Sequence, residues 1–116
     1  MKVIIAGGRD YYCSAEDFLM LDMLHAKYHF TEVVSGGATG ADTCGEQWAR
    51  DNGLARTQFL PDWKRLGRLA GPIRNAEMIE YVKPDGWLVV FPGGAGTNDV
   101  VRRAQKAGLH IERGGG

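Results

Sequence analysis

Three glycine-rich segments of this sequence have the composition of loops that bind an anion. They are GGR at residues 7–9, GGATG at residues 36–40 and GGAG at residues 93–96. Each follows a run of β-branched or aromatic residues and precedes a loop or a helical pattern. Glycine lets the backbone approach a ligand closely, and the first turn of a helix offers N–H groups without intrahelical partners. The segments therefore predict a phosphate-binding site.

The same segments argue against two common nucleotide-binding motifs. GATGAD lacks the Lys-Ser/Thr pair of a P-loop, and no segment has the spacing G-x-G-x-x-G. ATP hydrolysis and ordinary NAD binding therefore lose support. His25 and His29 are four residues apart, but no third metal ligand lies at a suitable spacing. We expect neither a cofactor nor a metal site.

Charged and amide side chains near these loops are candidate ligand contacts. Arg9 and Arg74 can bind phosphate through two parallel hydrogen bonds. Asn75 can bond to a base or a ribose, or it can cap a turn. Asp42 and Asp99 each fall in the first turn of a predicted helix, where the helix dipole alone favours an acid. Each aspartate can therefore either stabilise the start of its helix or take part in the chemistry of the site.

Strand and helix patterns alternate along the whole chain. Strands are predicted at residues 2–6, 31–35, 55–60, 87–91 and 109–111, and a helix follows each of the first four, directly or after a loop. Alternation of this kind builds right-handed βαβ units. The sequence predicts a Rossmann-like, three-layer α/β/α domain with a mostly parallel sheet of about five strands in the order 3-2-1-4-5.

The segment at residues 61–71 has poor periodicity and is expected to be an irregular loop before a helix that starts at Pro72. Trp63 in this loop can stack on a base or anchor the loop to the core, and we favour the anchor. Burial is expected for Trp48 and Trp87.

Length and composition limit what else the chain can be. The 116 residues, 44% of them apolar, fit one domain, which we place at residues 1–113 with a flexible glycine tail at 114–116. The formal net charge is zero, so nucleic-acid and membrane partners are not expected. The first apolar run is too short for a signal peptide, which favours a cytoplasmic location. Cys13 and Cys44 lack a C-x-x-C pattern and are expected to be reduced thiols.

Four motifs together resemble the YspA-like, cpYpsA-related branch of the SLOG superfamily. They are GGRD, SGGATGAD, DWKRLGRLAGPIRNAEM and FPGGAGT, and they span nearly the whole chain. The resemblance implies a Rossmann-like domain that binds nucleotides or their derivatives. It also implies a homodimer, since related proteins often complete their sites across a helix interface.

Two relatives within that superfamily imply more specific functions. In LOG-type phosphoribohydrolases an Arg with a Met four residues later precedes PGG-x-GT-x-E, and Arg74, Met78 and PGGAGTND match this pattern. Asp99 stands at the glutamate position but is one methylene shorter, so binding is better supported than catalysis. SGGATGAD is similar to SG-x-A-x-GID of DprA, a single-stranded-DNA protein, with Asp42 as the matching acid. A net charge of zero is not typical of a surface that binds single-stranded DNA, so this function is not expected here.

We therefore expect a nucleotide or nucleotide-derived ligand, bound by a sensor, a sequestering protein or an enzyme. The alternatives are a nucleotide N-glycosidase that releases ribose 5-phosphate and a DprA-like nucleic-acid module. Arg74 and Asp99 are the predicted catalytic pair. The predicted ligand-binding residues are Gly7, Gly8, Arg9, Ser35, Gly36, Gly37, Asp42, Asn75, Pro92, Gly93, Gly94, Gly96 and Thr97.

Overall fold

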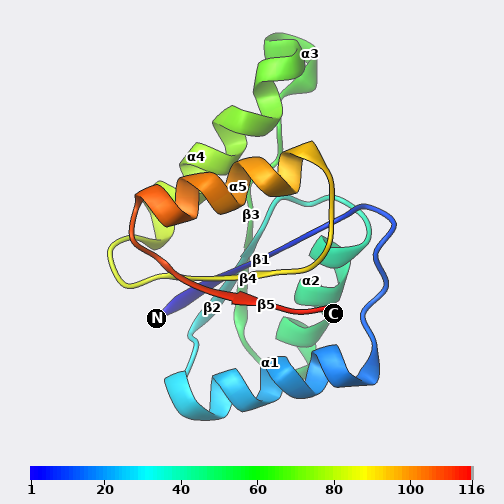
Figure 1. Cartoon of the computed structure of the whole chain (residues 1–116), viewed down its shortest axis with the longest axis vertical. Coiled ribbons are helices and arrows are strands. Elements are labelled where there is room, and N and C mark those ends of the chain that lie inside the picture. The colour runs from blue at the N-terminus through cyan, green and yellow to red at the C-terminus, as the bar shows by residue number, and fades with distance from the viewer. Residues whose placement is uncertain (116) are drawn as a thin grey trace.

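A computed structural model, which describes residues 1–115, contains a central five-stranded sheet (Figure 1). Its strands are β1 (Lys2–Ala6), β2 (Glu32–Ser35), β3 (Ala55–Gln58), β4 (Trp87–Val90) and β5 (His110–Arg113). Every neighbouring pair is parallel, and the order is β3-β2-β1-β4-β5. The predicted fold class and strand order are confirmed.

Helices cover both faces of the sheet (Figure 1). α1 (Ala15–Tyr28) and α2 (Ala41–Asp51) pack on one face, and α4 (Ala70–Val82) and α5 (Ala95–Lys106) pack on the other. In β1, the four residues after Lys2 are apolar and buried because helices cover both faces of the strand. Ile4 packs with the α4 and α5 side, whereas Val3 and Ile5 pack with the α1 and α2 side. Successive side chains of a strand point to opposite faces, so a central strand covered on both faces must be apolar throughout.

The start of α1 follows from a capping box at Ser14. The Ser14 hydroxyl accepts a hydrogen bond from the Asp17 amide at 3.1 Å, and the Ser14 amide donates to the Asp17 carboxylate at 2.9 Å. Two amides that a helix would leave unpaired are thereby satisfied. α1 therefore begins directly after Ser14.

The segment at residues 61–71 differs from the expected irregular loop. It contains α3 (Trp63–Leu66) and a short 3-10 helix (Gly67–Leu69), and α4 begins at Ala70 rather than at Pro72. Asp62 caps α3, since its carboxylate accepts from the Arg65 amide at 3.1 Å. Pro72 fits inside the first turn of α4, where an amide N–H has no intrahelical partner to lose.

The expectation of two free thiols is wrong, because Cys13 and Cys44 form a disulfide with their Cα atoms 6.2 Å apart. The loop after β1 and the start of α2 meet in space, where the Ala41 amide donates to the Gly8 carbonyl at 3.1 Å. That contact brings together two cysteines separated by 31 positions in the sequence. The spacing of the two cysteines in the sequence does not indicate that they pair.

Of the flexible glycine tail expected at residues 114–116, the structure describes Gly114 and Gly115, and both form hydrogen bonds. The Gly114 amide donates to the Val90 carbonyl at 2.9 Å, and the Gly115 amide donates to the Asp17 carboxylate at 3.2 Å. Gly116 lies outside the described residues. Within residues 1–115, none of the helices has the length and apolar character needed to cross a membrane.

Candidate functional site

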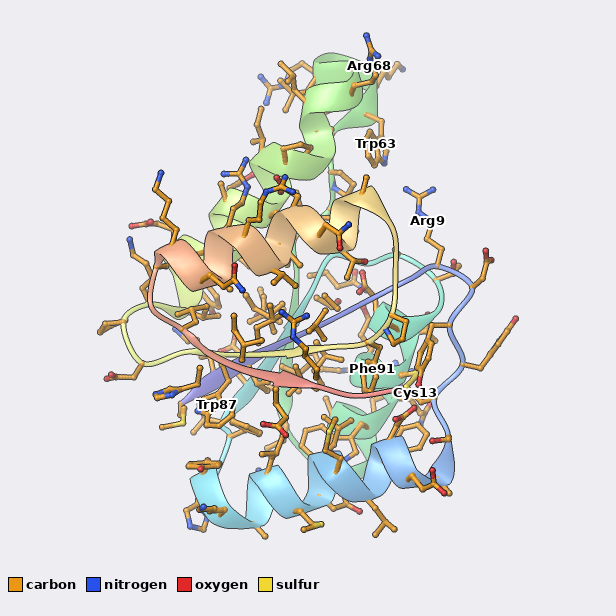
Figure 2. The ribbon with its side chains drawn as sticks, in the orientation of Figure 1. Arg9, Cys13, Trp63, Arg68, Trp87 and Phe91 are labelled. Carbon is orange, nitrogen blue, oxygen red and sulfur yellow. A yellow bond between two sulfur atoms is a disulfide. The ribbon has the colours of Figure 1, made fainter. Side chains whose placement is uncertain are left out.

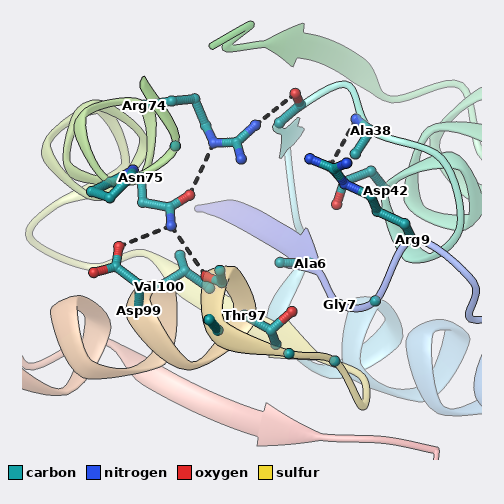
Figure 3. Close-up of a pocket in the computed structure, with 18 of the residues that line it drawn as sticks. Ala6, Gly7, Arg9, Ala38, Asp42, Arg74, Asn75, Thr97, Asp99 and Val100 are labelled. Carbon is teal, nitrogen blue, oxygen red and sulfur yellow. Dashed lines mark hydrogen bonds between the residues drawn. The ribbon is translucent and has the colours of Figure 1, made fainter. Parts of the chain in front are cut away.

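A cavity of about 1080 Å³ opens at the carboxyl edge of the sheet, where the loops after β1, β2 and β4 meet α4 and α5 (Figure 3). β1 and β4 are neighbours at the centre of the sheet, and the chain turns to opposite sides after them. Ligands of open α/β sheets bind at this type of topological switch point. All three glycine-rich segments contribute residues to the wall of this cavity.

Backbone hydrogen bonds tie the three loops to one another. The Gly8 amide donates to the Pro92 carbonyl at 2.8 Å, and the Gly8 carbonyl accepts from the Ala41 amide. Gly40 has a φ of 72°, and a Cβ there would lie 2.5 Å from the carbonyl oxygen of Arg9. Only glycine combines that dihedral angle with so close an approach. The loops therefore form one connected rim.

The start of α5 opens onto the cavity without a capping side chain. Its N-cap is Gly94, which makes no side-chain cap hydrogen bond, and residues 94–97 all line the cavity. A Cβ built on Gly94 or on Gly96 would meet nothing within 4 Å. The first amides of a helix carry partial positive charge, so this open end suits an anion.

Arg74 and Asn75 form a hydrogen-bonded chain across the cavity (Figure 3). The guanidinium of Arg74 donates from Nη1 to the Gly36 carbonyl at 2.8 Å and from Nε to Oδ1 of Asn75 at 2.9 Å. Nδ2 of Asn75 then donates to Oδ2 of Asp99 at 3.0 Å and to the Gly96 carbonyl at 3.2 Å. The loop after β2 is thus connected to α5 through α4.

Asp99 is held by several donors at once. Besides Asn75, its carboxylate accepts from Nε of Arg103 at 2.9 Å and from Nη2 of Arg102 at 3.4 Å. Burial alone would raise the pKa of Asp99, but the hydrogen bonds from Asn75 and Arg103 outweigh it and hold that pKa below its ordinary value. Asn75 bridges the predicted pair of Arg74 and Asp99.

Asp42 is a buried acid in the cavity wall, with 6% of its surface exposed. Burial raises its pKa to about 6, although a hydrogen bond from the Ala38 amide at 3.0 Å and the charge of Arg74 act in the opposite direction. The negative charge of Glu46 adds to the rise. Asp42 therefore exchanges its proton closer to neutral pH than an ordinary aspartate does.

Most of the predicted site residues line this one cavity. Those that do are Gly7, Gly8, Arg9, Gly36, Asp42, Arg74, Asn75, Pro92, Gly93, Gly94, Gly96, Thr97 and Asp99. Ser35 and Gly37 are outside the lining. The Ser35 hydroxyl is buried and donates to Glu46 at 2.5 Å, and the Gly37 amide donates to that hydroxyl at 3.4 Å.

Sequence reasoning missed part of the cavity wall. Arg68, Gly71 and Pro72 line the cavity from the segment that was expected to be a loop and from the start of α4, and Arg102 lines it from α5. Trp63 also faces the cavity and is 48% exposed, so it is less buried than an anchor would be. Arg102 follows Asp99 by three residues, a helical spacing that places both on one face and could have indicated its position. Nothing in the sequence indicated the shape of the 61–71 segment.

Comparison with known proteins identifies the family. The YspA, cpYpsA-related SLOG family matches residues 1–66. This chain belongs to that family. The Gene 61 protein of Mycobacterium phage D29 is 39% identical over 99 residues, which cover 79% of this chain and 78% of the phage protein. No solved structure matches this SLOG protein. The family match includes the first two glycine-rich loops, while α4, α5 and the third loop follow it in the chain.

Proposed function

We propose that this SLOG protein binds the phosphate-bearing end of a nucleotide or a nucleotide-derived ligand in the cavity. The observation that carries the proposal is the uncapped start of α5, which opens onto a cavity that is also lined by Arg9 and Arg74. Backbone amides and two guanidinium groups offer donors from three directions. A phosphate group, with its several acceptor oxygens, matches such a set of donors.

Two arginines in the cavity wall support an anionic ligand. Neither Arg9 nor Arg74 forms an ion pair within residues 1–115. Arg74 donates instead to two neutral acceptors, the Gly36 carbonyl and the Asn75 amide oxygen. Figure 3 shows the two guanidinium groups extending toward each other from opposite sides of the cavity. An anion between them would offset their mutual repulsion.

Cavity size favours a ligand larger than phosphate alone. Sites for small molecules and cofactors commonly enclose roughly 300–1,000 Å³. A cavity of about 1080 Å³ leaves room for a ribose and a base beyond the phosphate. A single-stranded nucleic acid would need a basic groove, and its binding would weaken steeply as salt is added.

Hydrolysis of the ribosyl bond has less support than binding. The reaction builds positive charge on the sugar, and a free carboxylate near the anomeric carbon would stabilise it. Asp99 is the candidate, but its two oxygens are engaged by Asn75, Arg102 and Arg103. We therefore propose that Asp99 holds Asn75 in position and that Arg74 binds the phosphate.

Isothermal titration calorimetry with ribose 5-phosphate, four nucleoside monophosphates and ADP-ribose tests the proposal. We expect at least one of these ligands to bind and the variants Arg9→Ala and Arg74→Ala to weaken that binding by tenfold or more, about 1.4 kcal/mol each. Arg56→Ala is the matched control, because Arg56 is an exposed arginine of β3 outside the cavity lining. No binding, or equal losses in all three variants, would contradict the proposal.

A further inference from the structure

The outer end of the cavity carries an exposed aromatic side chain that the phosphate-binding proposal leaves without a role. Trp63, at the start of α3, lines the same cavity as the glycine-rich loops. Figure 2 shows it on the arm formed by α3 and the start of α4, facing the side of the molecule where Arg9 extends from the loop after β1. The phosphate-binding end and this aromatic ring therefore belong to one continuous space.

Trp63 is held in place without being buried. Its indole lies against Gly71 of α4, where an added Cβ would be 3.3 Å from the ring atom Cη2. Asp62 fixes the backbone on the other side of the residue by capping α3. Trp63 is nevertheless 48% exposed, whereas Trp48 and Trp87 are only 2% and 6% exposed. The ring is supported along one edge, and much of its surface faces solvent.

We propose that Trp63 stacks on the base of the bound ligand, so that the cavity selects nucleotides over sugar phosphates. This inference rests on the phosphate site proposed above. Every base presents a flat π surface, and stacking on an aromatic side chain contributes favourably whichever base is bound. Trp63 and the start of α5 line the same cavity of about 1080 Å³, which is large enough for a ribose to lie between the phosphate and the base. Trp63 is then a specificity-determining residue, and Gly71 is the position that leaves space for it.

The test compares the affinity for the tightest-binding nucleoside monophosphate with the affinity for ribose 5-phosphate, which has no base. We expect the unchanged protein to prefer the nucleotide, and Trp63→Leu to reduce this preference by at least about fivefold. Ribose 5-phosphate should bind Trp63→Leu and the unchanged protein equally well. Trp63→Phe should keep most of the preference, because phenylalanine still offers a flat ring. Met23→Ala is the control, an exposed apolar residue of α1 outside this cavity.

Tryptophan fluorescence gives a second readout that does not depend on affinity alone. The nucleotide should quench the emission of Trp63, ribose 5-phosphate should not, and the quenching should vanish in Trp63→Phe. Equal affinity of the unchanged protein for the two ligands, or an unchanged preference in Trp63→Leu, would overturn the stacking role and leave the phosphate site intact. Failure of every phosphate ligand to bind the unchanged protein would overturn both proposals.

Discussion

Nε of Arg74 donates to Oδ1 of Asn75 at 2.9 Å, so two consecutive residues of α4 hold each other's side chains at the cavity wall. The bond orients the carboxamide of Asn75 so that its Nδ2 reaches Asp99 and the Gly96 carbonyl. Asn75 is 3% exposed, and water cannot readily replace these partners.

Asn75→Ala should therefore lower the free energy of unfolding by roughly 1–3 kcal/mol, because it leaves Nε of Arg74 without this acceptor and removes one donor each from Asp99 and the Gly96 carbonyl. Urea denaturation measures the change. Asn98→Ala is the control, since Asn98 is an exposed residue of α5, and it should shift stability by less than about 0.5 kcal/mol. Equal stability of the two variants would show that the Asn75 network adds nothing to the fold.

Valine at Gly94 or Gly96 should block ligand binding while leaving the fold intact. Both glycines line the cavity at the start of α5, and an added Cβ meets nothing within 4 Å, so valine fits without a clash and adds bulk where we place the phosphate. Calorimetry should give no measurable binding for either variant, with circular dichroism unchanged. Ala26→Val adds the same side chain at an exposed position of α1 and should bind normally. Normal binding by both glycine variants would refute the assignment of this loop.

Asp42 should make stability depend on pH between about 4 and 6. Its pKa is raised to about 6 in the folded protein, so the fold favours the protonated acid. Its stabilising contribution is therefore present below pH 4 and is lost as the pH rises through 6, a change of about 3 kcal/mol. Asp42→Asn cannot ionise. The stability of Asp42→Asn relative to the unchanged protein should rise over this range in urea denaturation, and a constant difference would contradict the shift.

Reduction of the Cys13–Cys44 disulfide should destabilise the protein. A cross-link between residues 31 positions apart restricts the unfolded chain, which corresponds to roughly 3–4 kcal/mol. Thermal denaturation should show a lower midpoint with dithiothreitol, whereas the double variant Cys13→Ser, Cys44→Ser should not respond to it. Two titratable thiols in the folded protein without reductant would contradict the pairing.

Incubation with nucleoside monophosphates or ADP-ribose should yield no free base or ribose 5-phosphate above background, even where the ligand binds. The reason is the engagement of Asp99 by Asn75, Arg102 and Arg103. Chromatography of the reaction mixture measures the products. Turnover that disappears in Asp99→Asn and in Arg74→Ala, with binding retained in Asp99→Asn, would instead establish an enzyme.

Most of the fold followed from the sequence because the five strands and the helices α1, α2, α4 and α5 have local signals, whereas α3 has none. The apolar run of β1 and the capping box at Ser14 are examples, and both act over a few residues. Contacts between distant residues have no such signal. Asn75 and Asp99 are 24 positions apart, and their hydrogen bond exists only because α4 and α5 pack side by side.

Trp63 illustrates a second limit. The residues beside Trp63 in the sequence do not indicate whether its ring is buried or lines a cavity. The ring packs against Gly71, and a single glycine eight positions later gives no pattern from which that contact could be predicted. The glycines of the sequence therefore indicated where the cavity lies, whereas nothing in the sequence indicated the hydrogen bonds between the polar side chains that line it.

The hydrogen bonds from Gly8 to Pro92 and from Ala41 to Gly8 also affect how quickly a ligand can be captured. Because the loops hold one another, an arriving molecule has no segment to order, and the conformational entropy that a mobile loop would lose is already lost when the chain folds. Association should then proceed as a single step at a rate that rises in proportion to ligand concentration, without a slow closing phase. Differences in affinity between ligands would then lie mainly in their dissociation rates.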